Sequence, residues 1–222
     1  MQLLFDLDGT LSDSRRGIVR CLVHTLQTLG HEVPSIPRLR LCVGPPLASV
    51  FQSLLTNYDS DHIERAIAIY RERYEAIGIS ESALFPGVPE ALNELHERNH
   101  RLQLVTNKPE PYAKRILQQF RIAAFFHDVF APRLDDRIAT KSVLVRTALA
   151  GGPYQKNQIA MIGDRAEDII AARENRIFSA AAAWGYGTSE EIAEAKPDRI
   201  FHTMSDYARW IESRSAAINQ NA

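Results

Sequence analysis

Two carboxylates stand two residues apart near the start of the chain, where Leu3-Leu4-Phe5 leads into Asp6 and Asp8 before a Gly-Thr turn. In an extended segment, residues two apart project to the same face, so these side chains are expected to lie side by side at the end of a buried strand. Carboxylates that close repel by about 4 kcal/mol at an effective dielectric constant of roughly 20. The pair therefore requires a cation, a shared proton or open solvent, and both a metal site and a simple water-facing turn are open at this point.

The composition excludes several classes of partner. The 222 residues are 45% hydrophobic and 24% charged, as in ordinary globular proteins, and the formal net charge of -1 provides no positive field for nucleic acid or anionic lipid. No apolar run approaches membrane-spanning length, and we expect neither nucleic acid nor a membrane as a partner. Cys21 and Cys42 lack metal-ligand spacing, which favours free thiols in a reducing compartment and a cytoplasmic location.

The pattern of the chain changes near residue 84. Before it, apolar spacing predicts helices at residues 15–29, 47–55 and 60–77, with Pro34 and Pro37 in a connection. After it, strands are predicted at 102–105, 129–131, 159–162, 178–183 and 199–201, and helices at 88–97, 109–120, 140–149, 166–174 and 205–211, with a frayed tail after Ser213. This alternation predicts an α/β fold with a doubly wound, Rossmann-like parallel sheet. We expect a core of residues 1–14 and 81–222 and an inserted helical cap domain of residues 15–80.

Polar side chains follow three of the predicted strands. The first strand runs into Asp6, the strand at 102–105 is followed by Thr106-Asn107-Lys108, and the strand at 159–162 is followed by Gly163-Asp164. Because the carboxyl ends of parallel strands meet at one edge of a sheet, where ligands bind, these groups are expected to converge there.

These residues carry a resemblance to a known family. Asp6-Leu7-Asp8-Gly9-Thr10-Leu11, then Thr106-Asn107, then Lys141, then Gly163-Asp164-Arg165-Ala166-Glu167-Asp168 resemble the four motifs of the haloacid dehalogenase-like hydrolase superfamily. The helical block lies where the cap domain of its phosphoglycolate phosphatase-like subgroup is found. The segments 42–47, 134–137 and 184–187 are also similar to that subgroup. Asp136 stands where the subgroup commonly has glycine, so the loop before Lys141 is expected to differ in shape.

The resemblance implies a Mg²⁺-dependent phosphatase that hydrolyses a small, phosphoglycolate-like phosphate ester through an aspartyl-phosphate. Asp6 would be the nucleophile, and Asp8 the general acid and base. The implied metal ligands are Asp6, the backbone carbonyl of Asp8 and Asp164, with Asp168 anchoring water in the outer coordination sphere. Thr106 and the backbone N–H of Asn107 would hold the phosphoryl oxygens, and Lys141 would neutralise both the phosphate and Asp6.

Each assignment has a simpler alternative. Asp168 is also explained as a charge at a helix N-terminus, and Lys141 as a solvated helix residue. Thr106 and Asn107 fit a helix cap before Pro109. Lys108 could reach the substrate, but we expect a solvated side chain. The segment 184–187 could clamp a ligand, but we expect a turn with a packed aromatic ring. Arg15 and Arg16 either attract an anionic substrate or are ordinary surface charges.

Two other functions remain open for the whole chain. A phosphomutase of the same fold would return the phosphoryl group to another hydroxyl of the substrate. A catalytically idle relative would instead bind a partner through its cap domain. We expect a monomer or a homodimer.

Overall fold

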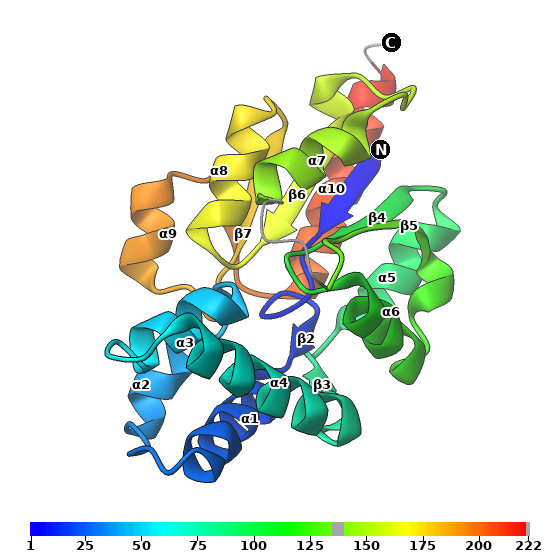
Figure 1. Cartoon of the computed structure of the whole chain (residues 1–222). Helices are drawn as coiled ribbons and strands as arrows, with labels where there is room; N and C mark the ends of the chain where they lie inside the picture. The colour runs from blue at the N-terminus through cyan, green and yellow to red at the C-terminus, as the bar shows by residue number, and fades with distance from the viewer. Residues whose placement is uncertain (135–139, 221–222) are drawn as a thin grey trace. The chain divides into compact units, whose positions relative to one another are not determined.

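A six-stranded parallel sheet forms the centre of the larger of two units in the computed structural model, which describes residues 1–134 and 140–220 (Figure 1). The strand order is β5-β4-β1-β6-β7-β8, and every adjacent pair runs parallel. The strands are β1 (Gln2–Phe5), β4 (Arg101–Val105), β5 (Phe126–Phe130), β6 (Ile159–Gly163), β7 (Phe178–Ala182) and β8 (Arg199–Phe201). The α/β, Rossmann-like fold class predicted from the alternation is therefore confirmed.

Strand β1 lies inside the sheet, between β4 and β6, and Leu3, Leu4 and Phe5 give it apolar side chains on both faces. Leu4 packs in a cluster with Val145 and Ala172, whereas the neighbouring Phe5 meets the ring of Tyr207 edge to face, with centroids 6.0 Å apart. Leu3, Leu4 and Phe5 have no exposed surface. The strand that carries the first site residues is thus fixed from both sides of the sheet.

Helices cover both faces of this sheet. They are α5 (Val88–Glu97), α6 (Glu110–Gln119), α7 (Lys141–Leu149), α8 (Ala166–Glu174), α9 (Ser189–Ala195) and α10 (Met204–Gln220). Helices α7 and α8 pack against the face that bears Leu4, and α10 contacts α5 on the face that bears Phe5. Short 3-10 turns lie at Ala123–Phe125 and Lys156–Gln158, and β2 (Ser12–Asp13) with β3 (Ala83–Leu84) forms a separate two-stranded sheet.

The smaller unit comprises Ser14–Ala83 and is helical, whereas Met1–Asp13 and Leu84–Ala222 form the larger one. Its elements are α1 (Arg15–Thr28), α2 (Ile36–Arg40), α3 (Leu47–Leu54), α4 (Ser60–Ala76) and the 3-10 turn Gly78–Glu81. Helix α4 packs against α1 and α3. A Cβ atom on Gly17 of α1 would overlap the carbonyl oxygen of Gly78, so only glycine permits this close approach. In the first turn of α1, Arg15 is half-buried and Arg16 is exposed.

Two element predictions were wrong, and some elements were not predicted. Residues 36–40, assigned to a connection, form α2, because Pro37 lies in the first helical turn, where its missing N–H costs nothing. The tail after Ser213 is not frayed up to Gln220, since α10 continues to that residue. Helix α9 and the short β2–β3 pair were not predicted at all.

The helices and the cysteines bear on two other expectations from the sequence. In the part of the chain that the structure describes, no helix is both long enough and apolar enough to cross a membrane. Cys21 and Cys42 are not disulfide-bonded, as their spacing predicted. The segment 135–137, which includes Asp136, lies outside the described residues.

Candidate active site

A buried lysine joins two of the predicted carboxylates at the carboxyl edge of the sheet. Lys141, the first residue of α7, donates from Nζ to Asp6 Oδ1 at 2.5 Å, and the same Nζ lies 2.9 Å from Asp168 Oδ1. Its side chain is only 4% exposed, so the alternative of a solvated helix residue is wrong. Asp168 lies in the first turn of α8 and accepts a hydrogen bond from the Arg165 N–H, and it therefore also caps this helix.

The carboxylate of Asp164 is held by residues from two distant segments. Thr10 Oγ1 donates to Asp164 Oδ1 at 3.0 Å, and the backbone N–H of Tyr186 donates to Oδ2 at 2.8 Å. A Cβ atom on either Gly9 or Gly185 would overlap the Asp164 side chain, and Gly9 also has a φ of +91°. Glycine is thus required at Gly9 both by conformation and by space.

Asp8 contacts a second buried lysine. Lys108 Nζ donates to Asp8 Oδ2 at 2.6 Å, and the Lys108 side chain is 6% exposed. The expectation of a solvated Lys108 is therefore wrong. A signal for this contact lay in the sequence, because Lys108 follows β4 at the same sheet edge to which β1 delivers Asp8.

Thr106 and Asn107 follow the neighbouring strand β4. Thr106 is buried, and its Oγ1 accepts a hydrogen bond from the Lys108 N–H at 3.2 Å. A hydroxyl that accepts through a lone pair retains its O–H proton to donate. The Asn107 side chain donates to Glu167 Oε2 at 2.9 Å. The alternative of a helix cap is wrong, because α6 begins after Pro109, which serves as its N-cap without a side-chain bond.

The segment 184–187 forms a turn that packs on the loop after β1. Trp184 Nε1 donates to the Thr10 carbonyl at 2.9 Å, and the Tyr186 hydroxyl donates to Asp13 Oδ1 at 2.9 Å. This agrees with the predicted turn and its packed aromatic ring. The same turn supplies the N–H that holds Asp164, a contact that the spacing of the sequence did not indicate.

Burial of several carboxylates together shifts their pKa values. Burial raises the pKa of Asp6 to about 6, with the Asp168 charge adding to the rise and the Lys141 ammonium opposing it. Burial, with the charges of Asp6 and Asp168, also raises the pKa of Asp164 well above its usual range. Burial alone would lower the pKa of Lys141, but the neighbouring carboxylates outweigh it and raise that pKa, so Lys141 stays protonated.

The same cluster is chemically suited to a divalent cation. Carboxylate oxygens of Asp6, Asp164 and Asp168 all lie within 4.8 Å of one another and are buried. Asp168 Oδ1 accepts no hydrogen bond from any described residue, although the Lys141 ammonium is close to it. Hard oxygen donors with excess negative charge are the ligands that Mg²⁺ prefers. The residues present therefore fit such an ion.

The fold and the four motif segments correspond to one class of hydrolase. The model of the family described as haloacid dehalogenase-like hydrolase matches residues 3–182. The chain belongs to this family.

Curated relatives match the chain along most of its length. A 5'-nucleotidase from Pseudomonas aeruginosa is 32% identical over 211 residues, which is 95% of each chain. A phosphoglycolate phosphatase from Vibrio cholerae is 34% identical over 210 residues, covering 89% of this chain and 91% of the relative. Together with the family match, the latter places the chain in the phosphoglycolate phosphatase-like subgroup.

Solved structures show the same fold. A predicted phosphatase from Clostridium acetobutylicum is 31% identical with a TM-score of 0.86, covering 96% of this chain and 98% of that one. Protein Tyrosine Kinase A of Mycobacterium tuberculosis is 32% identical with a TM-score of 0.79, covering 95% and 97% respectively. Similar folds thus occur in proteins with different named activities.

Proposed function

We propose that this phosphatase is a Mg²⁺-dependent phosphomonoesterase that hydrolyses a small phosphorylated metabolite through an aspartyl-phosphate on Asp6. The observation that supports it best is the buried cluster of Asp6, Asp164 and Asp168 around the Lys141 ammonium. Lys141 fixes one oxygen of Asp6 by a hydrogen bond and neutralises charge that would otherwise repel a phosphate dianion.

In the first step, an Asp6 carboxylate oxygen attacks phosphorus while the bond from phosphorus to the leaving oxygen breaks. Asp8 gives its proton to that leaving oxygen, and an alcohol departs. In the second step, water attacks the phosphorus of the aspartyl-phosphate, and Asp8 takes the proton from the water. The bond between phosphorus and Asp6 breaks, which releases inorganic phosphate and restores both carboxyl groups.

Other residues bind rather than react. Thr106 Oγ1 accepts a hydrogen bond from the Lys108 N–H through a lone pair. Its O–H proton is therefore still available to donate to a phosphoryl oxygen. The backbone N–H of Asn107 is a second proposed donor to the phosphoryl group. Mg²⁺ would be held by Asp6, Asp164 and the Asp8 carbonyl, with Asp168 outside the direct ligands, and would supply positive charge to the phosphoryl oxygens.

The substrate class is proposed from the names of relatives. A phosphoglycolate phosphatase and a 5'-nucleotidase match the chain at similar identity, and we place phosphoglycolate-like esters first, with nucleoside 5'-monophosphates second. The two cysteines outside disulfides support the cytoplasm as the location. The oligomeric state is proposed to be a monomer or a homodimer.

A phosphate-release screen tests this proposal. Purified protein with Mg²⁺ is assayed on 2-phosphoglycolate, sugar phosphates and nucleoside 5'-monophosphates, and kcat/KM values are compared. We expect Mg²⁺-dependent release, with the highest kcat/KM for a small phosphate ester. Absence of release across the panel would contradict the proposal and favour an idle, partner-binding relative.

Phosphoryl transfer is the second candidate, because a structural relative is named as a tyrosine kinase and mutases share this chemistry. A transferase would pass the phosphoryl group from Asp6 to a hydroxyl other than that of water. The same screen distinguishes the two functions when every phosphoryl group is accounted for. Substrate loss that exceeds phosphate release, with an isomer or a phosphorylated acceptor formed, would favour transfer.

A further inference from the structure

Lys108 is a buried cation that the proposed reaction does not use. Its side chain is 6% exposed, and its Nζ donates to Asp8 Oδ2 at 2.6 Å. Lysine is seldom buried unless it is paired, because removing an ammonium group from water is costly. A lysine without a function at this position would have a lower free energy with its ammonium group in solvent. The burial of Lys108 against Asp8 therefore requires an explanation.

The site contains two ammonium groups, and each contacts a different reacting carboxylate. Lys141 donates to Asp6, the proposed nucleophile, and Lys108 donates to Asp8, the proposed general acid and base. The two lysines come from separate elements, since Lys141 begins α7 and Lys108 follows β4. Lys108 is also joined to the phosphate-binding side, because its backbone N–H donates to Thr106 Oγ1.

The backbone of Asp8 is held by a tight turn, but its side chain needs a separate constraint. The Leu7 carbonyl accepts hydrogen bonds from the N–H groups of Leu11 and Ser12 at 3.0 and 2.9 Å, and the Gly9 N–H donates to the Ser12 carbonyl. These bonds fix the main chain, and the hydrogen bond from the Lys108 ammonium restricts the side-chain torsions of Asp8. The Asp8 side chain is 17% exposed and is therefore reachable from solvent.

We propose that Lys108 is a positioning residue that orients the Asp8 carboxylate for proton transfer. An ammonium group only donates hydrogen bonds, so Oδ2 of Asp8 must accept, and the other oxygen, Oδ1, is the one that carries the transferred proton. Lys108 thereby selects the oxygen that delivers the proton to the leaving group and later receives one from water. The inference rests on the proposed function, because it assigns a task to Asp8.

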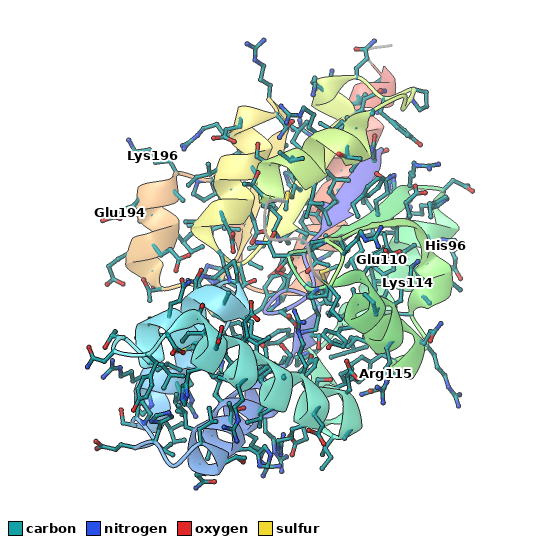
Figure 2. The ribbon with its side chains drawn as sticks, in the orientation of Figure 1. His96, Glu110, Lys114, Arg115, Glu194 and Lys196 are labelled. Atoms are coloured by element: carbon teal, nitrogen blue, oxygen red, sulfur yellow. The ribbon has the colours of Figure 1, made fainter. Side chains whose placement is uncertain are left out.

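Lys108→Met removes the charge and retains most of the side-chain volume, and Lys114→Met is the matched control. Lys114 lies on α6, its side chain is 56% exposed, and it pairs with Glu110 (Figure 2). Circular dichroism and a thermal melt establish that both variants fold.

Two substrates distinguish a role in proton transfer from a role in substrate binding. One is p-nitrophenyl phosphate, whose leaving phenolate needs little protonation. The other is the alkyl phosphate that ranks first in the phosphate-release screen.

We expect Lys108→Met to lower kcat for the alkyl phosphate by about 10- to 100-fold with little change in KM, a part of the factor that general acid–base catalysis contributes. The pre-steady-state burst of nitrophenolate should change much less, because that step does not depend on a proton from Asp8. Lys114→Met should match the wild type. An equal loss in both assays, or a raised KM with unchanged kcat, would overturn the proposal and indicate substrate binding instead.

A double-mutant comparison separates this inference from the proposed function. We expect Asp8→Asn with Lys108→Met to be no slower than Asp8→Asn alone, because Lys108 acts through Asp8. Losses that multiply would overturn the positioning role. Full activity in Asp8→Asn would contradict the proposed function itself, whereas an impaired Asp8→Asn beside a normal Lys108→Met would remove only the role of Lys108.

Discussion

Asp164 is a buried site residue whose charged form is disfavoured by its surroundings. Burial and the charges of Asp6 and Asp168 raise its pKa, so in the absence of a cation its negative charge costs stability. Thr10 and the Tyr186 N–H nevertheless hold the carboxylate in place. A side chain that is fixed in an unfavourable charge state is typical of a metal ligand, and this can be measured without an activity assay.

Asp164→Asn should abolish most of the stabilisation by Mg²⁺. At a hundredfold excess over Kd, a bound ion contributes about 2.7 kcal/mol, which corresponds to a Tm rise of about 5 °C or more in a chain of this size. The variant should melt at or above the wild-type temperature in EDTA, because a repelling charge is gone, and should respond weakly to Mg²⁺. Asp206→Asn is the control that keeps the full response, because Asp206 lies in the first turn of α10, where its side chain is 42% exposed and pairs with Arg209. A full Mg²⁺ shift in Asp164→Asn would rule out this residue as a ligand.

The meeting of Asp6, Thr106 and Asp164 at one sheet edge was predicted because each follows a strand in a chain whose strands alternate with helices. Asp6 and Thr106 each follow a short apolar run, and parallel strands bring such positions together. The same rule brings Lys108 to this edge but does not predict its burial against Asp8. Its burial depends on the pairing of β1 with β4, and a lysine in a loop is ordinarily solvated.

At the scale of elements, α9 supports the helix that carries Asp168. Glu191 of α9 accepts hydrogen bonds from Arg165 Nε and from the Ala166 N–H, both at 2.8 Å, at the start of α8. Burial acts to raise the pKa of Glu191, but these bonds outweigh it and lower that pKa below its ordinary value of 4.5. Glu191 therefore adds stability above pH 4.5, and this contribution is lost as the pH falls through its lowered pKa.

Glu191→Gln should lower the free energy of unfolding near neutral pH by about 1 kcal/mol, as expected for a charge-assisted bond at a partly exposed position. Below pH 4.5 the difference between variant and wild type should shrink, because the wild type then loses the same charge. Urea melts across this pH range provide the measurement. Glu190→Gln, an exposed neighbour in the same helical turn, should show neither effect, and equal curves for the two variants would refute the role of Glu191.

Helix α9 was missed because its sequence is a poor guide to its packing. Among its seven residues only Ile192 and Ala195 are buried, which is too few to produce an apolar period. Helix α2 was not predicted because Pro37 suggests a break in a helix. Proline is nevertheless compatible with the first helical turn, where Pro37 lies. Helices α1, α4, α5 and α8 were predicted to within about two residues because each buries a regular stripe.

At the scale of the whole molecule, Tyr207 places a polar hydroxyl in the core of the larger unit. The Tyr207 hydroxyl is fully buried and forms no hydrogen bond with any described residue. Its ring packs edge to face on Phe5 and Phe201, at centroid distances of 6.0 and 5.3 Å. Burial raises the pKa of Tyr207, so the hydroxyl remains neutral. The ring stabilises the sheet, whereas the hydroxyl costs free energy.

Tyr207→Phe should therefore raise the free energy of unfolding by about 1 kcal/mol, since it removes an unsatisfied buried donor and keeps the ring. Tyr186→Phe is the matched opposite case. It removes a hydroxyl that donates to Asp13 at 2.9 Å, and it should destabilise the protein by a similar amount. Guanidinium melts of both variants test the sign. A loss of stability in Tyr207→Phe would show that the hydroxyl has a partner in solution.

The fold class could be predicted from the alternation of strands and helices, but the order of the strands could not. Gln2 pairs with Arg101 on one side and with Ile159 on the other, and the residues of the smaller unit lie between the first two in sequence. Strand pairs this far apart in sequence depend on how the helices and strands pack against one another, and no local sequence pattern encodes them.

The proposed reaction depends on a covalent bond between Asp6 and phosphorus. The most direct measurement mixes the protein and Mg²⁺ with ³²P-labelled substrate, quenches with acid during turnover and locates the label by peptide mapping. We expect a hydroxylamine-labile phosphoryl group on the peptide that contains Asp6. Asp6→Asn should show no label and a loss of turnover of about 1,000-fold or more, because an amide cannot form the acyl-phosphate. Near-normal turnover in Asp6→Asn, or a label on another residue, would contradict the account.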